Sequence, residues 1–315
     1  MLRGILALSG IVLVASAPCA AREFTRLAVL GDSVNYGVNP DYDPVVHGWT
    51  HMLLGVGGDP FPPTREATLH SLWPGMAALN ASVSGSTAVQ WAAGNSPYMN
   101  SVLAFQPDLA IVLLGGWDVI NFMADGTITT AEKNQLFSSL STIVARLETL
   151  DPPPYIILLT YYDLMDGYSQ SLPLIYGRYR PLSPMTLEGN AFIRQLASER
   201  GCGVVDVYPA FLHHCYGRQF GDPTPLEPPY VRLPVSNLDI HPNTAGHEQI
   251  YLLVYDALAG LRREPERFTV ETADLDKSGA VDGTDLVLLL SSVRERRTRP
   301  RSLLSFAQVW GMGTP

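Results

Sequence analysis

The stretch Arg26-Leu-Ala-Val-Leu-Gly-Asp-Ser33 is a short apolar run that ends in a glycine and two polar residues. Four more short apolar runs follow along the chain, at Ala77–Val83, Leu109–Leu114, Tyr155–Thr160 and Val204–Val207. Each run is unbroken rather than alternating, which is typical of parallel strands covered on both faces. The pattern predicts five strands of one mainly parallel sheet.

Longer amphipathic segments separate these runs. The clearest helix is expected over Ala131–Leu150, because Thr129 and Glu132 form a capping box before it and three prolines follow it. Two more helices are expected over Leu187–Arg200 and Asn243–Leu261. The alternation of strands and helices predicts an α/β three-layer sandwich, in which ligands bind beyond the carboxyl ends of the strands.

Three connections are longer and richer in proline and glycine than ordinary loops, namely Gly55–Gly75, Asp163–Pro184 and Tyr208–Pro234. They either form the rim of a substrate cleft or are surface loops without a role in binding. The net charge of −9 argues against nucleic acid as a partner, and 46% hydrophobic residues suffice for a substantial core.

The amino-terminal segment has the anatomy of a secretory signal peptide, with Arg3, an apolar run over Ile5–Ala15 and small residues up to Ala21. We expect cleavage after Ala21 and export to the periplasm, the cell surface or the medium. The apolar run is too short to span a bilayer.

Two cysteines, Cys202 and Cys215, follow the predicted signal peptide. In an oxidising compartment they either form a disulfide or remain two buried thiols. A zinc site with His213 and His214 is a third alternative, but a second pair of ligands is missing from the spacing.

Four short motifs lie at or near the ends of predicted strands or at the start of the last helix. In chain order they are Gly31-Asp32-Ser33, Asn80-Ala-Ser-Val-Ser-Gly85, Gly115-Gly116-Trp117-Asp118 and Asp239-Ile-His241-Pro-Asn243. In type and order they resemble the blocks of the SGNH (GDSL-type) hydrolases, and the resemblance spans roughly residues 26 to 260. It implies a flavodoxin-like fold and a serine ester hydrolase whose chemistry needs no metal.

The resemblance also implies roles for individual residues. Ser33 would be the nucleophile, His241 its general base, and the N–H groups of Ser33 and Gly85 the oxyanion donors. Asp32 would brace the turn without taking part in catalysis. The six other histidines are assigned to the surface or the core.

Two positions depart from the family pattern. Trp117 stands where the family has an asparagine whose amide is the third oxyanion donor, so either its indole N–H replaces that amide or one donor is missing. A missing donor reduces turnover about 100- to 1000-fold. Leu238 stands where the family has the triad aspartate. Either Asp239 orients His241, which we favour, or a backbone carbonyl near Leu238 does so.

A second pattern begins after the main domain, which we place at residues 22–265. Oxygen ligands occur at the spacing of a calcium loop, and a glycine occupies the sixth position. The candidate calcium ligands are Asp274, Asp276, Ser278, the backbone carbonyl of Ala280, Asp282 and Asp285. The loop resembles a dockerin repeat, and a second loop is absent from the sequence after it.

Residues 266–315 therefore form a predicted small helical, dockerin-like unit that holds structural Ca²⁺. It would bind a cohesin-type partner, act as a folding cap, or attach the protein to a surface. Because such units accompany enzymes that act on polysaccharides, the favoured function is removal of acyl or acetyl groups from carbohydrate esters. The alternatives are a lipase or short-chain esterase, and a non-catalytic carbohydrate-binding module that keeps the fold.

Overall fold

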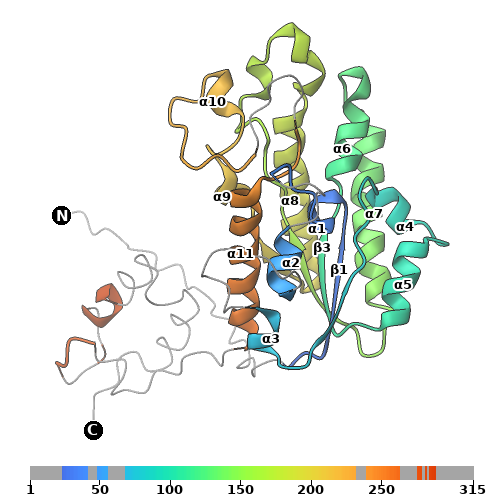
Figure 1. The fold of residues 1–315 in the computed structure, drawn as a ribbon, viewed down its shortest axis with the longest axis vertical. Coiled ribbons are helices and arrows are strands. Elements are labelled where there is room, and N and C mark those ends of the chain that lie inside the picture. Colours follow the sequence, from blue (N-terminus) through green and yellow to red (C-terminus); the bar gives the residue numbers. More distant parts are fainter. Residues whose placement is uncertain are drawn as a thin grey trace, which may run out of the picture. The chain divides into compact units, whose positions relative to one another are not determined.

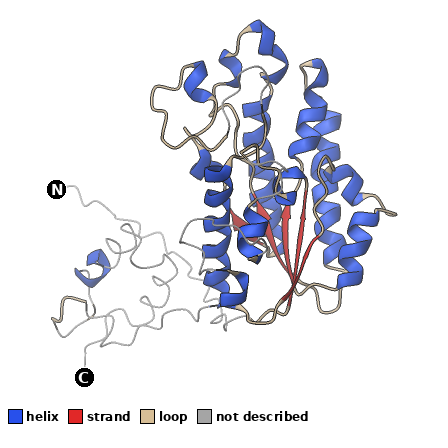
Figure 2. Cartoon of the chain, in the orientation of Figure 1, coloured by secondary structure: helices blue, strands red, loops and turns tan. Residues whose placement is uncertain are grey.

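The computed structural model describes residues 23–41, 48–55, 68–231, 239–262, 275–278, 281 and 284–288. The chain divides into one compact unit over Glu23–Gly260 and a second formed by Met1–Arg22 and Leu261–Pro315. The first unit is an α/β domain with helices on both faces of its sheet (Figure 1, Figure 2). The predicted signal peptide lies outside the described residues.

One five-stranded sheet forms the centre of the domain. Its strands are β1 (Arg26–Gly31), β2 (Ala77–Asn80), β3 (Leu109–Leu113), β4 (Tyr155–Leu159) and β5 (Gly203–Val205). They lie in the order β2-β1-β3-β4-β5, and every neighbouring pair is parallel. The predicted parallel sheet is thereby confirmed, and the carboxyl ends of β1, β3 and β4 meet at one edge.

The central strands are buried as predicted, but the edge strands are not. All five residues of β3 are buried, whereas no residue of β2 is, and Val204 in β5 is 38% exposed. The prediction of cover on both faces was wrong for these two strands, because an edge strand lacks a neighbour on one side. β2 also ends at Asn80 rather than Val83, since the Asn80 side chain accepts the N–H of Ser82 at 3.2 Å and turns the chain.

Three long helices flank the sheet. Helix α7 (Thr130–Leu147) begins at the predicted capping box, in which Glu132 accepts the N–H of Thr129 at 2.7 Å. Helix α8 (Leu182–Arg200) begins before the predicted Leu187, because Pro184 lies in the first turn, where its missing N–H is not needed. Helix α11 (Thr244–Arg262) follows the last motif.

Shorter helices complete the domain. They are α1 (Ser33–Tyr36), α2 (Trp49–Leu54), α3 (Leu69–Leu72), α4 (Ala88–Ala92), α5 (Pro97–Phe105), α6 (Gly116–Phe122), α9 (Tyr208–Phe211) and α10 (Gly217–Phe220), with 3₁₀ turns η2 (Met123–Asp125), η3 (Ser169–Ser171) and η4 (Leu174–Tyr179). No helix in the described part of the chain combines the length and the apolar character that a bilayer crossing requires.

The two cysteines are free thiols, so the disulfide alternative was wrong. Cys202 precedes β5 at the amino end of the sheet, whereas Cys215 is buried beyond its carboxyl end. The zinc alternative finds no support either, because no three His, Cys, Asp or Glu residues converge within the described ranges. His213 instead contacts Asp222 at 2.9 Å.

Candidate active site

Ser33 lies in a tight turn between β1 and α1. The Asp32 carboxylate caps the helix by accepting the N–H of Val34 at 3.0 Å, and it also accepts the Tyr161 hydroxyl at 2.7 Å. A Cβ at Gly31 would lie 2.4 Å from the Cβ of Asn35, so only glycine lets the helix fold back this closely. The local sequence therefore places Ser33 on the first turn of a helix at the carboxyl edge of the sheet.

The structure brings the first and last motifs together. The Oγ of Ser33 lies 3.0 Å from Nε2 of His241, although the two residues are 208 positions apart. Nδ1 of the same ring lies 2.9 Å from Oδ1 of Asp239. When Nδ1 carries the ring proton and donates a hydrogen bond to Asp239, Nε2 is left unprotonated and can accept the serine proton.

Of the two groups considered for orienting His241, the Asp239 carboxylate is the one in contact with the ring. Its Oδ1 also accepts the backbone N–H of His241 at 3.0 Å, so one oxygen holds both the ring and the main chain. Leu238 lies outside the described residues.

Two tyrosine hydroxyls, which the sequence reasoning missed, hold the segment that carries His241. The Tyr216 hydroxyl donates to the carbonyl of Asp239 at 2.7 Å and accepts its N–H at 3.1 Å. The Tyr162 hydroxyl donates to the carbonyl of Ile240 at 2.6 Å. Tyr162 could have been found, because it follows a predicted strand at its carboxyl end, whereas nothing in the sequence singles out Tyr216.

Tyr216 is itself positioned by a buried carboxylate from another loop. Asp166 has a left-handed backbone, with φ of 49°, and accepts the N–H groups of His213, Cys215 and Gly217, each at 2.9 Å. A Cβ at Gly217 would lie 2.5 Å from the Cβ of Asp166, so glycine is required at this contact. The loop over 163–184 and the described part of the loop over 208–234 thus help to hold the segment that carries His241.

The two backbone N–H groups expected to be oxyanion donors make no hydrogen bond in the described part of the chain. Among the described residues, the N–H groups of Ser33 and Gly85 have no hydrogen-bond acceptor. Gly85 has φ of 77°, which favours glycine, while a Cβ there would meet no atom within 4 Å. The space in front of this glycine is open.

The third motif is fixed by its aspartate rather than by its tryptophan. The buried Asp118 carboxylate accepts the N–H groups of Ala88 at 2.7 Å and Val89 at 3.3 Å, which caps α4 just after the second motif. Burial raises the pKa of Asp118. The Trp117 side chain is half-buried, and its indole N–H has no acceptor among the described residues.

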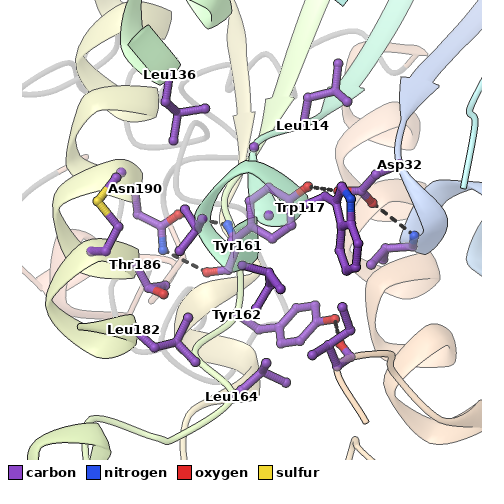
Figure 3. A pocket seen from close by; sticks show the side chains of 18 of the residues that line it. Asp32, Leu114, Trp117, Leu136, Tyr161, Tyr162, Leu164, Leu182, Thr186 and Asn190 are labelled. Atoms are coloured by element: carbon purple, nitrogen blue, oxygen red, sulfur yellow. Dashed lines mark hydrogen bonds between the residues drawn. The ribbon is translucent and has the colours of Figure 1, made fainter. Parts of the chain in front are cut away.

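A deep pocket begins at the nucleophile turn and runs between α6, α7 and α8. Its cavity volume is about 80 Å³, and it is open to solvent on one side. Ser33 and Ile240 line it. Trp117, Tyr161 and Tyr162, which are labelled in Figure 3, also belong to its wall. The remaining wall is largely apolar and comes from Leu114, Leu136, Leu140, Leu182, Met185 and Ile193.

The comparisons with known proteins agree with this geometry. Residues 29–249 match the model of the GDSL-like Lipase/Acylhydrolase family. The chain belongs to this family. The GDSL-like lipases and acylhydrolases are carboxylic ester hydrolases, and so is this protein. No curated protein sequence matches the chain.

Solved structures of other proteins share the fold at low sequence identity. Axe2, an acetylxylan esterase from Geobacillus stearothermophilus, is 17% identical with a TM-score of 0.51, over 76% of this chain and 95% of that one. A protein named as a GDSL-like lipase from Parabacteroides merdae is 17% identical with a TM-score of 0.53, over 78% of this chain and all of that one. At this identity the likeness shows the fold.

Two buried ionisable residues close to His241 in this GDSL-family hydrolase have shifted pKa values. Burial raises the pKa of Asp32 to about 6, although hydrogen bonds from Tyr161 and Val34 counteract part of that rise. Burial lowers the pKa of His247 to about 4, which keeps its ring neutral. His247 accepts the N–H of Trp49 at 3.3 Å and donates to the carbonyl of Val38 at 3.0 Å, consistent with the core role expected for it.

Proposed function

We propose that this GDSL-family hydrolase cleaves carboxylic esters with Ser33 as nucleophile, His241 as general base and Asp239 as the group that orients His241. The observation that carries the proposal is the pair of contacts from Ser33 Oγ to His241 Nε2 and from His241 Nδ1 to Asp239, at 3.0 and 2.9 Å. Nucleophile, base and orienting carboxylate at these distances are the requirements of a serine hydrolase.

The chemistry proceeds in two halves. Ser33 Oγ attacks the ester carbonyl while its proton passes to Nε2 of His241, and collapse of the tetrahedral intermediate expels the alcohol, which takes that proton. Water then loses a proton to His241 and attacks the acyl–Ser33 ester, which breaks to release the carboxylic acid as the proton returns to Ser33. Asp239 stabilises the imidazolium in both halves.

The free N–H groups of Ser33 and Gly85 would bind the oxyanion of each intermediate, and we propose the indole N–H of Trp117 as the third donor. The variant Trp117→Asn restores the family's residue and tests this role. If the indole does not donate, Trp117→Asn raises kcat on p-nitrophenyl acetate by about 100-fold. An unchanged or lower kcat supports donation by the indole.

The proposed natural substrate is an acylated or acetylated carbohydrate. The shared fold with an acetylxylan esterase supports this choice, and the alternatives are a lipid or a small soluble ester. Release of acetate from acetylated xylan, compared with release of acid from triglyceride emulsions and methyl esters, distinguishes the three classes.

Ser33→Ala tests the serine mechanism. Hydrolysis of p-nitrophenyl acetate should fall by about 10⁴- to 10⁶-fold, since no nucleophile remains. Ser138→Ala on the exposed face of α7 is the matched control and should retain full activity. Full activity of purified Ser33→Ala protein would overturn the proposal.

We also propose that residues 274–285 bind structural Ca²⁺ and that the protein is exported after cleavage behind Ala21. The Asp285 carboxylate accepts the N–H groups of Leu275 and Asp276, which brings two oxygen-bearing residues of the loop together. Asp274, Ala280 and Asp282 lie outside the described residues. Carboxylate oxygens are hard ligands that suit Ca²⁺. The bound ion would stabilise the loop and would take no part in the ester chemistry.

Calcium titration of the full chain by calorimetry, beside the double variant Asp276→Ala/Asp285→Ala, tests the loop. Binding by the parent chain alone supports a calcium site, and no binding by either protein contradicts it. Amino-terminal sequencing of the exported protein checks the cleavage site. A cohesin-type partner for this unit stays a prediction.

A further inference from the structure

We propose that the apolar pocket between α6, α7 and α8 binds the acyl chain of the ester, so that the enzyme prefers straight acyl chains several carbons longer than acetyl. The proposal rests on the ester hydrolysis proposed above and assigns the substrate's acyl part to a defined set of residues. Figure 3 shows the pocket walls, with Leu136 and Asn190 facing its interior from α7 and α8.

The position of the pocket relative to the catalytic groups places it on the acyl side. Ser33 lines the pocket, whereas neither His241 nor Gly85 does. The departing alcohol must lie beside His241, because Nε2 gives it a proton. A pocket that adjoins the nucleophile but is not lined by the base therefore receives the other half of the ester, which is the acyl chain.

Several polar side chains in the pocket wall already have partners, although the Trp117 indole and the Thr186 hydroxyl have none among the described residues. Asp32 accepts hydrogen bonds from Tyr161 and Val34. Asn190 accepts the backbone N–H of Tyr161 at 2.8 Å and donates to the carbonyl of the same residue at 2.7 Å. These groups already use their hydrogen bonds within the protein and are not available to sugar hydroxyls. The pocket therefore suits an apolar chain better than a carbohydrate.

A glycine in the middle of α8 keeps the pocket open. Gly189 lines the pocket, and a Cβ there would meet only the terminal methyl of Met185, at 4.0 Å. Glycine is the poorest helix former after proline, and α8 has no packing need for it, because the space in front of Gly189 is empty. A bound chain would fill that space.

The first test is the chain-length profile of the wild-type enzyme on p-nitrophenyl acetate, butyrate, hexanoate, octanoate and palmitate. Each methylene buried in the pocket should raise kcat/KM about fourfold, equivalent to about 0.8 kcal/mol, until the pocket is full. A profile that is highest on acetate and falls steadily would overturn the proposal.

Gly189→Leu places a side chain inside the pocket and is the decisive variant. We expect the ratio of kcat/KM on octanoate to that on acetate to fall at least tenfold, while acetate is still hydrolysed. The control is Gly94→Leu, which adds the same side chain in open space at a position that does not line the pocket. An unchanged ratio in folded Gly189→Leu protein would overturn the proposal.

Binding separates this inference from the proposed function. Octanoate is titrated by calorimetry into Ser33→Ala protein and into Ser33→Ala/Gly189→Leu protein. Binding to the Ser33→Ala protein alone supports the acyl pocket. If the wild-type enzyme hydrolyses no test ester, the ester chemistry is refuted, but this binding result still supports the pocket. Equal binding to both, or binding to neither, overturns the acyl pocket. If the double variant does not fold, the wild-type chain-length profile decides.

Discussion

The nucleophile turn and the segment of the general base are held in place in different ways. The turn around Ser33 combines bonds between its own neighbours with bonds from distant segments. Asp32 caps the N–H of Val34 and the Asn35 amide donates to the carbonyl of Leu30 at 2.9 Å, while the Tyr161 and Ser86 hydroxyls donate to Asp32 and to the carbonyl of Gly31. Residues 239–241 rely on the hydroxyls of two tyrosines from other loops. One half of the site therefore has several supports, both local and remote, whereas in the other half two remote hydroxyls hold the backbone of residues 239 and 240.

This difference predicts where the rate is sensitive to change. A turn with several local and remote bonds keeps most of its geometry when one of them is lost, whereas a segment held by two remote hydroxyls moves when either is removed. A displacement of about 1 Å at a catalytic group can cost about 100-fold in rate. Variants around His241 should therefore affect kcat more than comparable variants around Ser33.

The largest effect is expected at the orienting carboxylate. Asp239→Asn should lower kcat about 10⁴-fold, because the amide stabilises the wrong ring tautomer and cannot stabilise the imidazolium. Steady-state kinetics on p-nitrophenyl acetate measure the loss. Asp256→Asn, on the exposed face of α11, is the control. A loss below about tenfold would return the orienting role to a backbone carbonyl.

The next effect concerns the free energy of unfolding at acidic pH and the His247 ring. His247 lies on α11 and contacts Val38 behind the nucleophile turn. Its folded-state pKa of about 4 lies below the unfolded value of 6.5, so its contribution to stability is present above pH 6.5 and is lost as the pH falls towards 4. This loss amounts to about 3 kcal/mol.

His247→Gln should flatten the pH dependence of the unfolding free energy between pH 6.5 and 4. Glutamine stays neutral and keeps a donor and an acceptor, although the shape of the ring is lost. Urea unfolding across this pH range measures the slope. His70→Gln on α3 is the control, and an equal slope in the wild type and His247→Gln would show that His247 does not govern the acid sensitivity.

The smallest effect compares one tyrosine from each half. Tyr216→Phe should lower kcat about tenfold with little change in KM, because two hydrogen bonds to Asp239 are lost and each is worth about 1 kcal/mol. Tyr161→Phe removes one of two hydrogen bonds to Asp32 and should change kcat on acetate less than threefold. Equal losses in both variants would break the comparison between the two halves.

Local pattern was sufficient for the elements that carry the motifs. The apolar run before Ser33 predicted β1 and the turn, and the capping box at Thr129 predicted the start of α7. The motif ending in Asn243 predicted α11. The Asn243 side chain accepts the N–H of Gly246, in the first turn of that helix, at 3.0 Å. These features depend on residues a few positions apart, so they can be predicted from the sequence.

Other features were not legible because they depend on contacts between distant segments. The exposure of β2 and β5 follows from their places at the sheet edges, and the separation of Cys202 from Cys215 follows from the two ends of β5. The link from Asp166 to Tyr216 and on to Asp239 joins three loops through backbone hydrogen bonds. Backbone partners leave no signature in side-chain identity.

The sequence by itself determined the α/β class and the family, and it is the source of the proposed nucleophile, base and oxyanion donors, because all of these depend on apolar runs and on short motifs near their ends. Only the tertiary structure showed that the Asp239 carboxylate contacts the His241 ring, and revealed the apolar pocket beside Ser33. A ring's partner and a cavity's volume are set by segments up to hundreds of residues apart, which meet only when the chain has folded.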